Sequence, residues 1–224
     1  MHLLIPGIAN QSSGGAGGIT LPDAEAYWKL DGNATDSHGS NDLTNNHSVG
    51  FTTGKLNQCA SFADDYNDSL SITAAPTDYP FTFSCWFKTT NTQRAAMIVF
   101  VNGGADFCML EVTGSGYLAA RAFIYSSTSS STCNDGNWHH GVAVFASATS
   151  RQVYLDGVAA TASTGNWAFN SSVDTINVGK YGGGKAFDGE IDEAIWFNVA
   201  LTADNVSDLY GDGTPPSYDD ITWT

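Results

Sequence analysis

Short stretches that alternate apolar and polar residues are the feature that most constrains how this chain can fold. In residues 81–89 (FTFSCWFKT), Phe81, Phe83 and Cys85 fall on one side of an extended backbone. Successive side chains of a strand point to opposite faces, so this stretch predicts a strand with one buried face. Similar stretches follow one another, separated by Gly, Asn and Asp, which favour tight turns; Asp156–Gly157 is the clearest hairpin signal. The pattern predicts an all-β fold, an antiparallel sandwich of two sheets.

One segment near the C-terminus departs from regular alternation. In residues 187–198 (FDGEIDEAIWFN), Ile191 and Ala194 are three positions apart and cannot share a face of a regular strand. One extra residue near Asp192–Glu193, a β-bulge, restores the phase and re-aims a carboxylate. The next residues, 201–210 (LTADNVSDLY), predict one short C-terminal helix in which Thr202 is the N-cap.

Composition excludes several classes of partner. Eight Lys and Arg stand against 23 Asp and Glu, for a net charge of −15. Such a chain has no basic stripe to meet phosphates, so we expect neither a nucleic-acid partner nor attraction to anionic membrane surfaces. No apolar run approaches the roughly 18 residues that a membrane span needs, so we expect no membrane insertion. The many carboxylates do suit calcium.

The chain divides into three parts. Residues 21–212 carry the strand pattern and are expected to form one sandwich domain, and residues 213–224, interrupted by Pro, an extended tail. Residues 1–20 join an apolar patch to a Gly/Ser linker and resemble no signal peptide. We interpret them as an extended N-terminal arm that docks on a larger assembly, with a disordered fusion remnant as the alternative. The docking residues would be Leu3, Leu4, Ile5, Pro6 and Ile8.

The cysteines show no metal-binding spacing. Cys59 and Cys85 lie inside apolar strand patterns and are expected to be small buried residues. Cys108 and Cys133 can pair, but the sequence leaves that question open.

A family resemblance rests on blocks that occur in a fixed order. The blocks are AYWKLDGNATDSHG, CASFADD, FTFSCWFKT, DGNWHHGVAVF, VYLDGV, INVGKY and GEIDEAIWFNVALT. Over residues 24–212 the chain resembles a laminin G-like (concanavalin A-like) domain. The resemblance implies a jelly-roll sandwich that often holds a structural calcium ion and often binds carbohydrate. Relatives include lectins, adhesion modules and glycosidases, so the fold alone does not decide the function.

The resemblance implies a calcium site between the first and last strands. The loop that opens at Asp31 offers Asp31 and Asp36, with the Gly32 carbonyl free to turn toward a cation. In the family the first strand lies next to the last, so Asp192 would complete the site. The alternative is that Asp31 and Asp36 only make hydrogen bonds within turns.

We expect no catalysis from the last strand. Laminarinase-type glucanases of this fold place acids as E-x-D-x-E or E-x-D-x-x-E, with two carboxylates positioned for a retaining mechanism. Here Glu190 and Asp192 match the first two acids, but the third position is Ala194 or Ile195. The adjacent His139 and His140 are expected to point to opposite faces of a strand, which argues against a shared role.

Binding of glycans needs aromatic platforms and a few planar polar groups. The loop that holds Asp64, Asp65 and Asn67 can face a sugar, and Tyr66 and Tyr181 are the aromatic side chains assigned to the same site. Tyr125 and Trp167 are further aromatic residues outside clear core patterns. The alternative for each is ordinary packing at the rim of the sandwich.

These expectations together predict a non-catalytic protein that binds glycans. An acidic, adhesive type of domain without an export signal suits release by lysis, so we hypothesise a bacteriophage virion protein, a head decoration or fibre component. Residues 1–20 would contact other virion proteins, and multiple copies on the virion surface would bind cell-surface or environmental glycans with avidity. The alternatives are a capsid cement protein that binds no sugar and a free-standing secreted carbohydrate-binding module.

Overall fold

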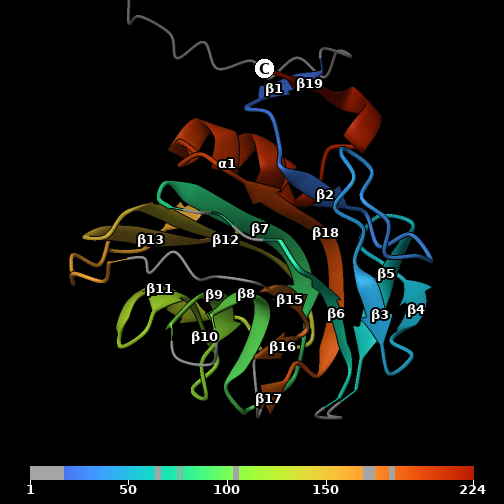
Figure 1. Ribbon diagram of the computed structural model, residues 1–224, viewed down its shortest axis with the longest axis horizontal. Coiled ribbons are helices and arrows are strands. Elements are labelled where there is room, and N and C mark those ends of the chain that lie inside the picture. Colours follow the sequence, from blue (N-terminus) through green and yellow to red (C-terminus); the bar gives the residue numbers. More distant parts are fainter. Residues whose placement is uncertain are drawn as a thin grey trace, which may run out of the picture.

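The structure is a sandwich of two antiparallel sheets (Figure 1). It is a computed structural model and describes residues 18–63, 67–74, 76, 78–102, 106–168, 175–181 and 185–224. The first sheet has seven strands in the order β11 (Tyr125–Thr132), β10 (Tyr117–Ala122), β9 (Asp106–Val112), β8 (Ala95–Asn102), β15 (Thr175–Val178), β6 (Ser69–Ile72) and β3 (Thr44–Asn46).

The second sheet has eight strands. Seven follow the order β14 (Val158–Ala159), β13 (Ser150–Leu155), β12 (Trp138–Ser147), β7 (Phe81–Lys88), β18 (Gly189–Phe197), β5 (Gln58–Phe62) and β4 (Gly50–Thr53), and β2 (Ala26–Trp28) also pairs with β18. A small hairpin joins β16 (Lys180–Tyr181) to β17 (Lys185–Ala186). The predicted all-β jelly-roll class is confirmed.

The strand patterns read from the sequence account for the core. Phe81, Phe83 and Cys85 of β7 are fully buried between the two sheets, as their alternation predicts. Strand β8 is buried on both faces: Met97 and Phe100 face the inter-sheet core, whereas Val99 belongs to a separate small cluster.

Local turn chemistry is also as predicted. Asp156 and Gly157 have φ values of 50° and 75° and join β13 to β14, with Leu155 paired to Val158. Two consecutive positive φ values are typical of the tightest hairpin turn, which favours an Asp-Gly pair.

Strand β18 contains the predicted bulge. Its register against β7 shifts between Asp192 and Ile195, and Glu193 has a φ of 49°. The bulge lets Ile191 and Ala194 both face the inter-sheet core despite their odd spacing.

Helix α1 (Ala203–Tyr210) lies across the outer face of the eight-stranded sheet (Figure 1). Thr202 is its N-cap, as predicted, and accepts a hydrogen bond from the Asn205 N–H. Val206 and Leu209 are buried in a second apolar cluster that includes Tyr27 of β2. In the part of the chain that the structure describes, no helix is long and apolar enough to cross a membrane.

The two ends of the described chain pair with each other. Strand β1 (Ile19–Leu21) runs parallel to β19 (Ile221–Trp223), after the short 3₁₀ turns Gly211–Gly213 and Tyr218–Asp220. The segment assigned to the linker therefore ends in a strand, and the tail is not extended throughout. Residues 1–17 lie outside the described residues. They include all of the proposed docking residues: Leu3, Leu4, Ile5, Pro6 and Ile8.

All four cysteines are buried free thiols, so Cys108 and Cys133 do not pair. Burial raises the pKa of Cys59 and that of Cys133 to about 12 each, which keeps both thiols protonated and unreactive near neutral pH.

Candidate functional site

The structure brings two of the predicted calcium ligands near each other. Asp192 is fully buried, and its Oδ2 accepts a hydrogen bond of 2.9 Å from the Leu56 N–H. Asp31 Oδ1 accepts one of 2.9 Å from the Gln58 N–H, two residues further along the same loop. Burial raises the pKa of Asp192 to about 7, and the negative charge of Asp31 acts in the same direction.

The other two predicted ligands have different surroundings. Asp36 accepts hydrogen bonds from the backbone N–H groups of Tyr27, His38 and Asn41. Burial alone would raise the pKa of Asp36, but these hydrogen bonds hold it below its usual range. Gly32 has a φ of 76°, which suits a glycine in a turn.

A calcium ion would therefore depend on Asp31, Asp192 and backbone carbonyls. Among the described residues, no group of three or more acidic, His or Cys side chains is placed to hold a metal ion. The calcium site stays a prediction. Both carboxylate oxygens of Asp36 already accept backbone hydrogen bonds that stabilise its own loop.

The three acids of β18 lie in three different environments. Glu190 forms an ion pair of 3.5 Å with Lys88. Glu193 is turned by the bulge and accepts a hydrogen bond from the Tyr27 hydroxyl. Burial raises the pKa of Glu193 to about 8. With Asp192 bound to a backbone loop, these carboxylates do not share one open cleft, which a glycosidase pair requires.

Most of the predicted glycan-binding loop lies outside the described residues. Asp64, Asp65 and Tyr66 lie outside the described residues. Asn67 is exposed just before β6, and Tyr181 has its backbone in β16 while its side chain is not described. This site therefore stays a prediction.

A different cleft, which the sequence reasoning missed, lies where β18 ends and β7 begins. Its volume is about 430 Å³. It is lined by Glu25, Pro76, Asp78, Tyr79, Pro80, Trp196 and Asn198.

The cleft combines planar polar groups with aromatic rings. Asn198 Nδ2 donates a hydrogen bond of 2.7 Å to Glu25 Oε2, and Asp78 Oδ1 accepts one of 2.7 Å from the Tyr79 N–H. Trp196 is only 3% exposed, and its indole N–H has no hydrogen-bond partner in the described part of the chain. A buried donor left without an acceptor costs about 1–3 kcal/mol, and this N–H has essentially no surface exposed to the cleft.

The sequence gives only a faint signal for this cleft. Its polar residues come from three distant segments, so no spacing links Glu25, Asp78 and Asn198. Trp196 follows the core pattern of β18, and its ring lies 6.0 Å from that of Phe100 in the core. Only the folded chain shows that the same residue also lines a cleft.

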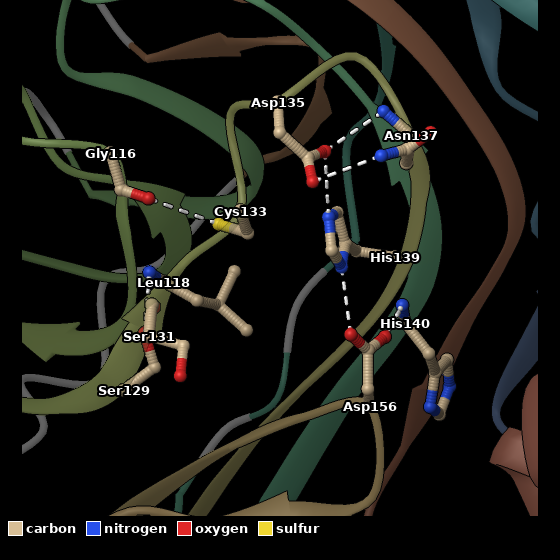
Figure 2. Close-up of polar contacts among 10 residues, drawn as sticks. All are labelled: Gly116, Leu118, Ser129, Ser131, Cys133, Asp135, Asn137, His139, His140 and Asp156. Carbon is tan, nitrogen blue, oxygen red and sulfur yellow. Dashed lines mark hydrogen bonds and ion pairs between the residues drawn. The ribbon is translucent and has the colours of Figure 1, made fainter.

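A second polar cluster lies at the start of β12, at the end of that strand far from the cleft (Figure 2). His139 is held between two carboxylates: Nδ1 lies 2.7 Å from Asp156 Oδ2, and Nε2 lies 3.1 Å from Asp135 Oδ1. The hydrogen bond to Asp156 is the main cause of the raised pKa of His139. His140 points to the other face, as predicted; its Nε2 lies 2.9 Å from Ser84 Oγ, and burial lowers its pKa to about 3. This cluster ties the β13–β14 turn to the start of β12.

Comparison with known proteins identifies the family. Residues 64–207, more than half of the chain, match the family described as the concanavalin A-like lectin/glucanases superfamily. The chain belongs to this family. A search of curated protein sequences finds no match.

Solved structures with the same fold include several binding domains. Domain 4 of AbnA, a GH43 extracellular arabinanase from Geobacillus stearothermophilus solved in complex with arabinotriose, has a TM-score of 0.71 at 18% identity, over 84% of this chain and 98% of that domain. The binding domain of botulinum neurotoxin serotype G has a TM-score of 0.64 at 14% identity, over 84% of this chain and 50% of that one. Trypanosoma rangeli sialidase has a TM-score of 0.63 at 13% identity, over 83% and 32%. This chain thus spans half of the neurotoxin domain and about a third of the sialidase, and the likeness concerns the fold.

Proposed function

We propose that this protein is a non-catalytic glycan-binding module whose cleft holds one sugar unit. The observation that carries the proposal is a cleft that brings the hydrogen-bonded Glu25–Asn198 pair together with Tyr79. Sugar hydroxyl groups both donate and accept, so they match a carboxylate and an amide that lie side by side. The aromatic ring of Tyr79 supplies an apolar wall for the C–H groups of the sugar.

The charge of the cleft indicates the kind of sugar. Glu25 and Asp78 line it, and none of the described lining residues is cationic. An acidic sugar would meet like charge, so neutral sugars are favoured. The arabinotriose complex of the arabinanase domain is consistent with a neutral ligand on this fold.

Absence of catalysis is part of the proposal. It is supported by the separate environments of Glu190, Asp192 and Glu193, two of which are buried under other parts of the chain. A retaining glycosidase needs two carboxylates facing one substrate bond.

Calorimetric titration with a panel of neutral oligosaccharides that includes arabinotriose tests the proposal. Glu25→Ala removes the carboxylate that lines the cleft, and we expect binding to weaken about tenfold, the equivalent of one lost hydrogen bond. Asn198→Ala should weaken it as well, whereas Asn137→Ala, near the opposite end of β12, should not. Unchanged affinity in both cleft variants, or a wild-type protein that binds no sugar of the panel, would overturn the proposal.

We propose in addition that the module works on a virion surface, where residues 1–20 anchor it to other virion proteins. Support comes from the apolar patch followed by a Gly/Ser linker, and from the acidic composition. Many copies would turn weak single contacts into firm attachment to cell-surface or environmental glycans.

Deletion of residues 1–17, which leaves strand β1 (Ile19–Leu21) in place, tests the anchor. The truncated protein should keep its affinity for sugar and lose its incorporation into particles. Equal incorporation of both forms would rule out the arm, and incorporation by a protein that binds no sugar would identify an architectural cement protein instead.

A further inference from the structure

We propose that the rings of Phe123 and Trp167 form a second sugar subsite beside the cleft, so that the ligand is an oligosaccharide spanning both. This inference rests on the proposed function and extends it from one sugar unit to several.

The two rings stack on each other and form a small apolar platform, in which Phe123 is exposed and Trp167 is half-buried against the core. Their centroids lie 4.4 Å apart with an interplanar angle of 17°, and Phe123 is 40% exposed. The adjacent Ile124 is 65% exposed. Large apolar side chains that are exposed next to one another often indicate a binding surface, whereas single exposed apolar residues do not. The flat C–H face of a sugar ring is complementary to such a platform.

Tyr79 makes the platform continuous with the cleft. Tyr79 lines the cleft, and its hydroxyl donates a hydrogen bond of 2.9 Å to the backbone carbonyl of Trp167. The same residue therefore contacts both sites.

A buried arginine holds the platform in place. Arg151 is fully buried, and its Nη2 donates to the carbonyl oxygens of Ala148 at 2.8 Å and Gly165 at 2.6 Å. The Trp167 N–H donates to the same Ala148 oxygen at 2.8 Å. Arg151 Nε and Nη1 have no hydrogen-bond partner in the described part of the chain, and the guanidinium lies over the Tyr125 ring, 5.7 Å from its centroid, so this cation is costly to bury. Its hydrogen bonds fix the position of the loop that carries Trp167. Arg151 is therefore a positioning residue.

Phe123 occupies a strained backbone position. It has a φ of 53° and begins the two-residue turn between Ala122 and Tyr125, where the hairpin favours glycine. A bulky residue there costs about 1–3 kcal/mol, and strain of this kind gathers at functional sites. A large ring at a position that suits glycine, stacked on Trp167, indicates that the ring is kept for contact with a ligand.

Ligands of two lengths test the second subsite. Arabinotriose and arabinose, with cellotriose and glucose as a second pair, are titrated against the full chain and its variants Trp167→Ala and Phe123→Gly. We expect both variants to bind the trisaccharide about tenfold more weakly while binding the monosaccharide as before. The control Val158→Ser changes a side chain that is 65% exposed on β14 and should alter neither affinity.

The outcomes separate this inference from the proposed function. If the wild-type protein binds both lengths equally, or if both variants bind the trisaccharide like the wild type, the second subsite is wrong and the cleft stands. If the wild-type protein binds no sugar, the proposed function fails and the second subsite fails with it. Phe123→Gly relieves backbone strain but loses the contact with Trp167, so its melting temperature is measured beside its affinity; a value near that of the wild type shows that lost binding is not due to unfolding.

Discussion

At the scale of single residues, the most informative side chains are those whose chemistry conflicts with their burial. Trp196 has a donor with no acceptor in the described part of the chain, Arg151 carries a buried charge with two nitrogens that lack hydrogen bonds there, and Glu193 is an acid that is 3% exposed. Each conflict lowers the free energy of unfolding, because a buried polar group without a full set of partners loses its hydration without full replacement. Trp196 lines the cleft and Arg151 binds the loop that carries Trp167, so two of the three lie next to the proposed binding sites.

The buried acids predict how stability depends on pH. Burial raises the pKa of Asp192 to about 7 and that of Glu193 to about 8, both above the values of an unfolded chain. The folded state therefore holds protons that the unfolded state has lost. This contribution to stability is complete below the unfolded pKa values and disappears as the pH rises through the folded ones.

Urea unfolding between about pH 5 and about pH 9 measures this effect. The wild-type protein should lose stability across that range, and Glu193→Gln should be more stable than wild type at the alkaline end, by about 1.4 kcal/mol for each unit by which burial raises the pKa of Glu193, with no gain at the acidic end. Glu190→Gln is the control, since that acid is partly exposed and pairs with Lys88. An identical slope in wild type and Glu193→Gln would contradict the assignment.

At the scale of elements, the last strand organises the molecule. Strand β18 pairs with β7, β5 and β2, and its bulge sends Ile191 to the core and Glu193 to the layer under α1. The loop between β4 and β5 then connects Asp192 to Asp31 near the first strands. This connection is the place where the proposed calcium ion would act.

Added calcium tests that connection through stability. If the ion binds only the folded protein, a free concentration of 100 times Kd raises the unfolding free energy by about 2.7 kcal/mol. The melting temperature should therefore rise with calcium and fall again with a chelator, and Asp192→Asn should abolish the response. Asp36→Asn should lower the melting temperature but leave the response intact, because Asp36 braces its own loop. If the melting temperature of the wild-type protein does not change with calcium, the calcium site is wrong.

At the scale of the whole molecule, the sandwich keeps different polar features near its two ends. The Asp135–His139–Asp156 cluster, near one end, ties a turn to a strand (Figure 2). The other end gathers the cleft and the Phe123–Trp167 platform, from loops that a rigid pair of sheets holds together. Function on such a fold is expected at loops carried by a stable scaffold. The net charge of −15 favours solubility and suits neutral ligands better than anionic ones.

Much of this architecture follows from local sequence signals. Alternation in β7, the Asp156–Gly157 turn, the bulge in β18 and the Thr202 cap are each set by neighbouring residues, so they could be predicted without the fold. The same reasoning placed Asp31 near Asp192 only through the family resemblance.

Tertiary structure alone decided the candidate site. Glu25, Asp78 and Asn198 are far apart in the chain, and Trp196 looks like any other core residue of its strand. The pairing of Phe123 with Trp167 likewise depends on a loop held by Arg151. Periodicity and turn chemistry act over a few neighbouring residues, so the sequence by itself determined the strands, the turns and the helix. A cleft depends on which distant loops meet at one end of the sandwich, and only the packing of the two sheets decides that.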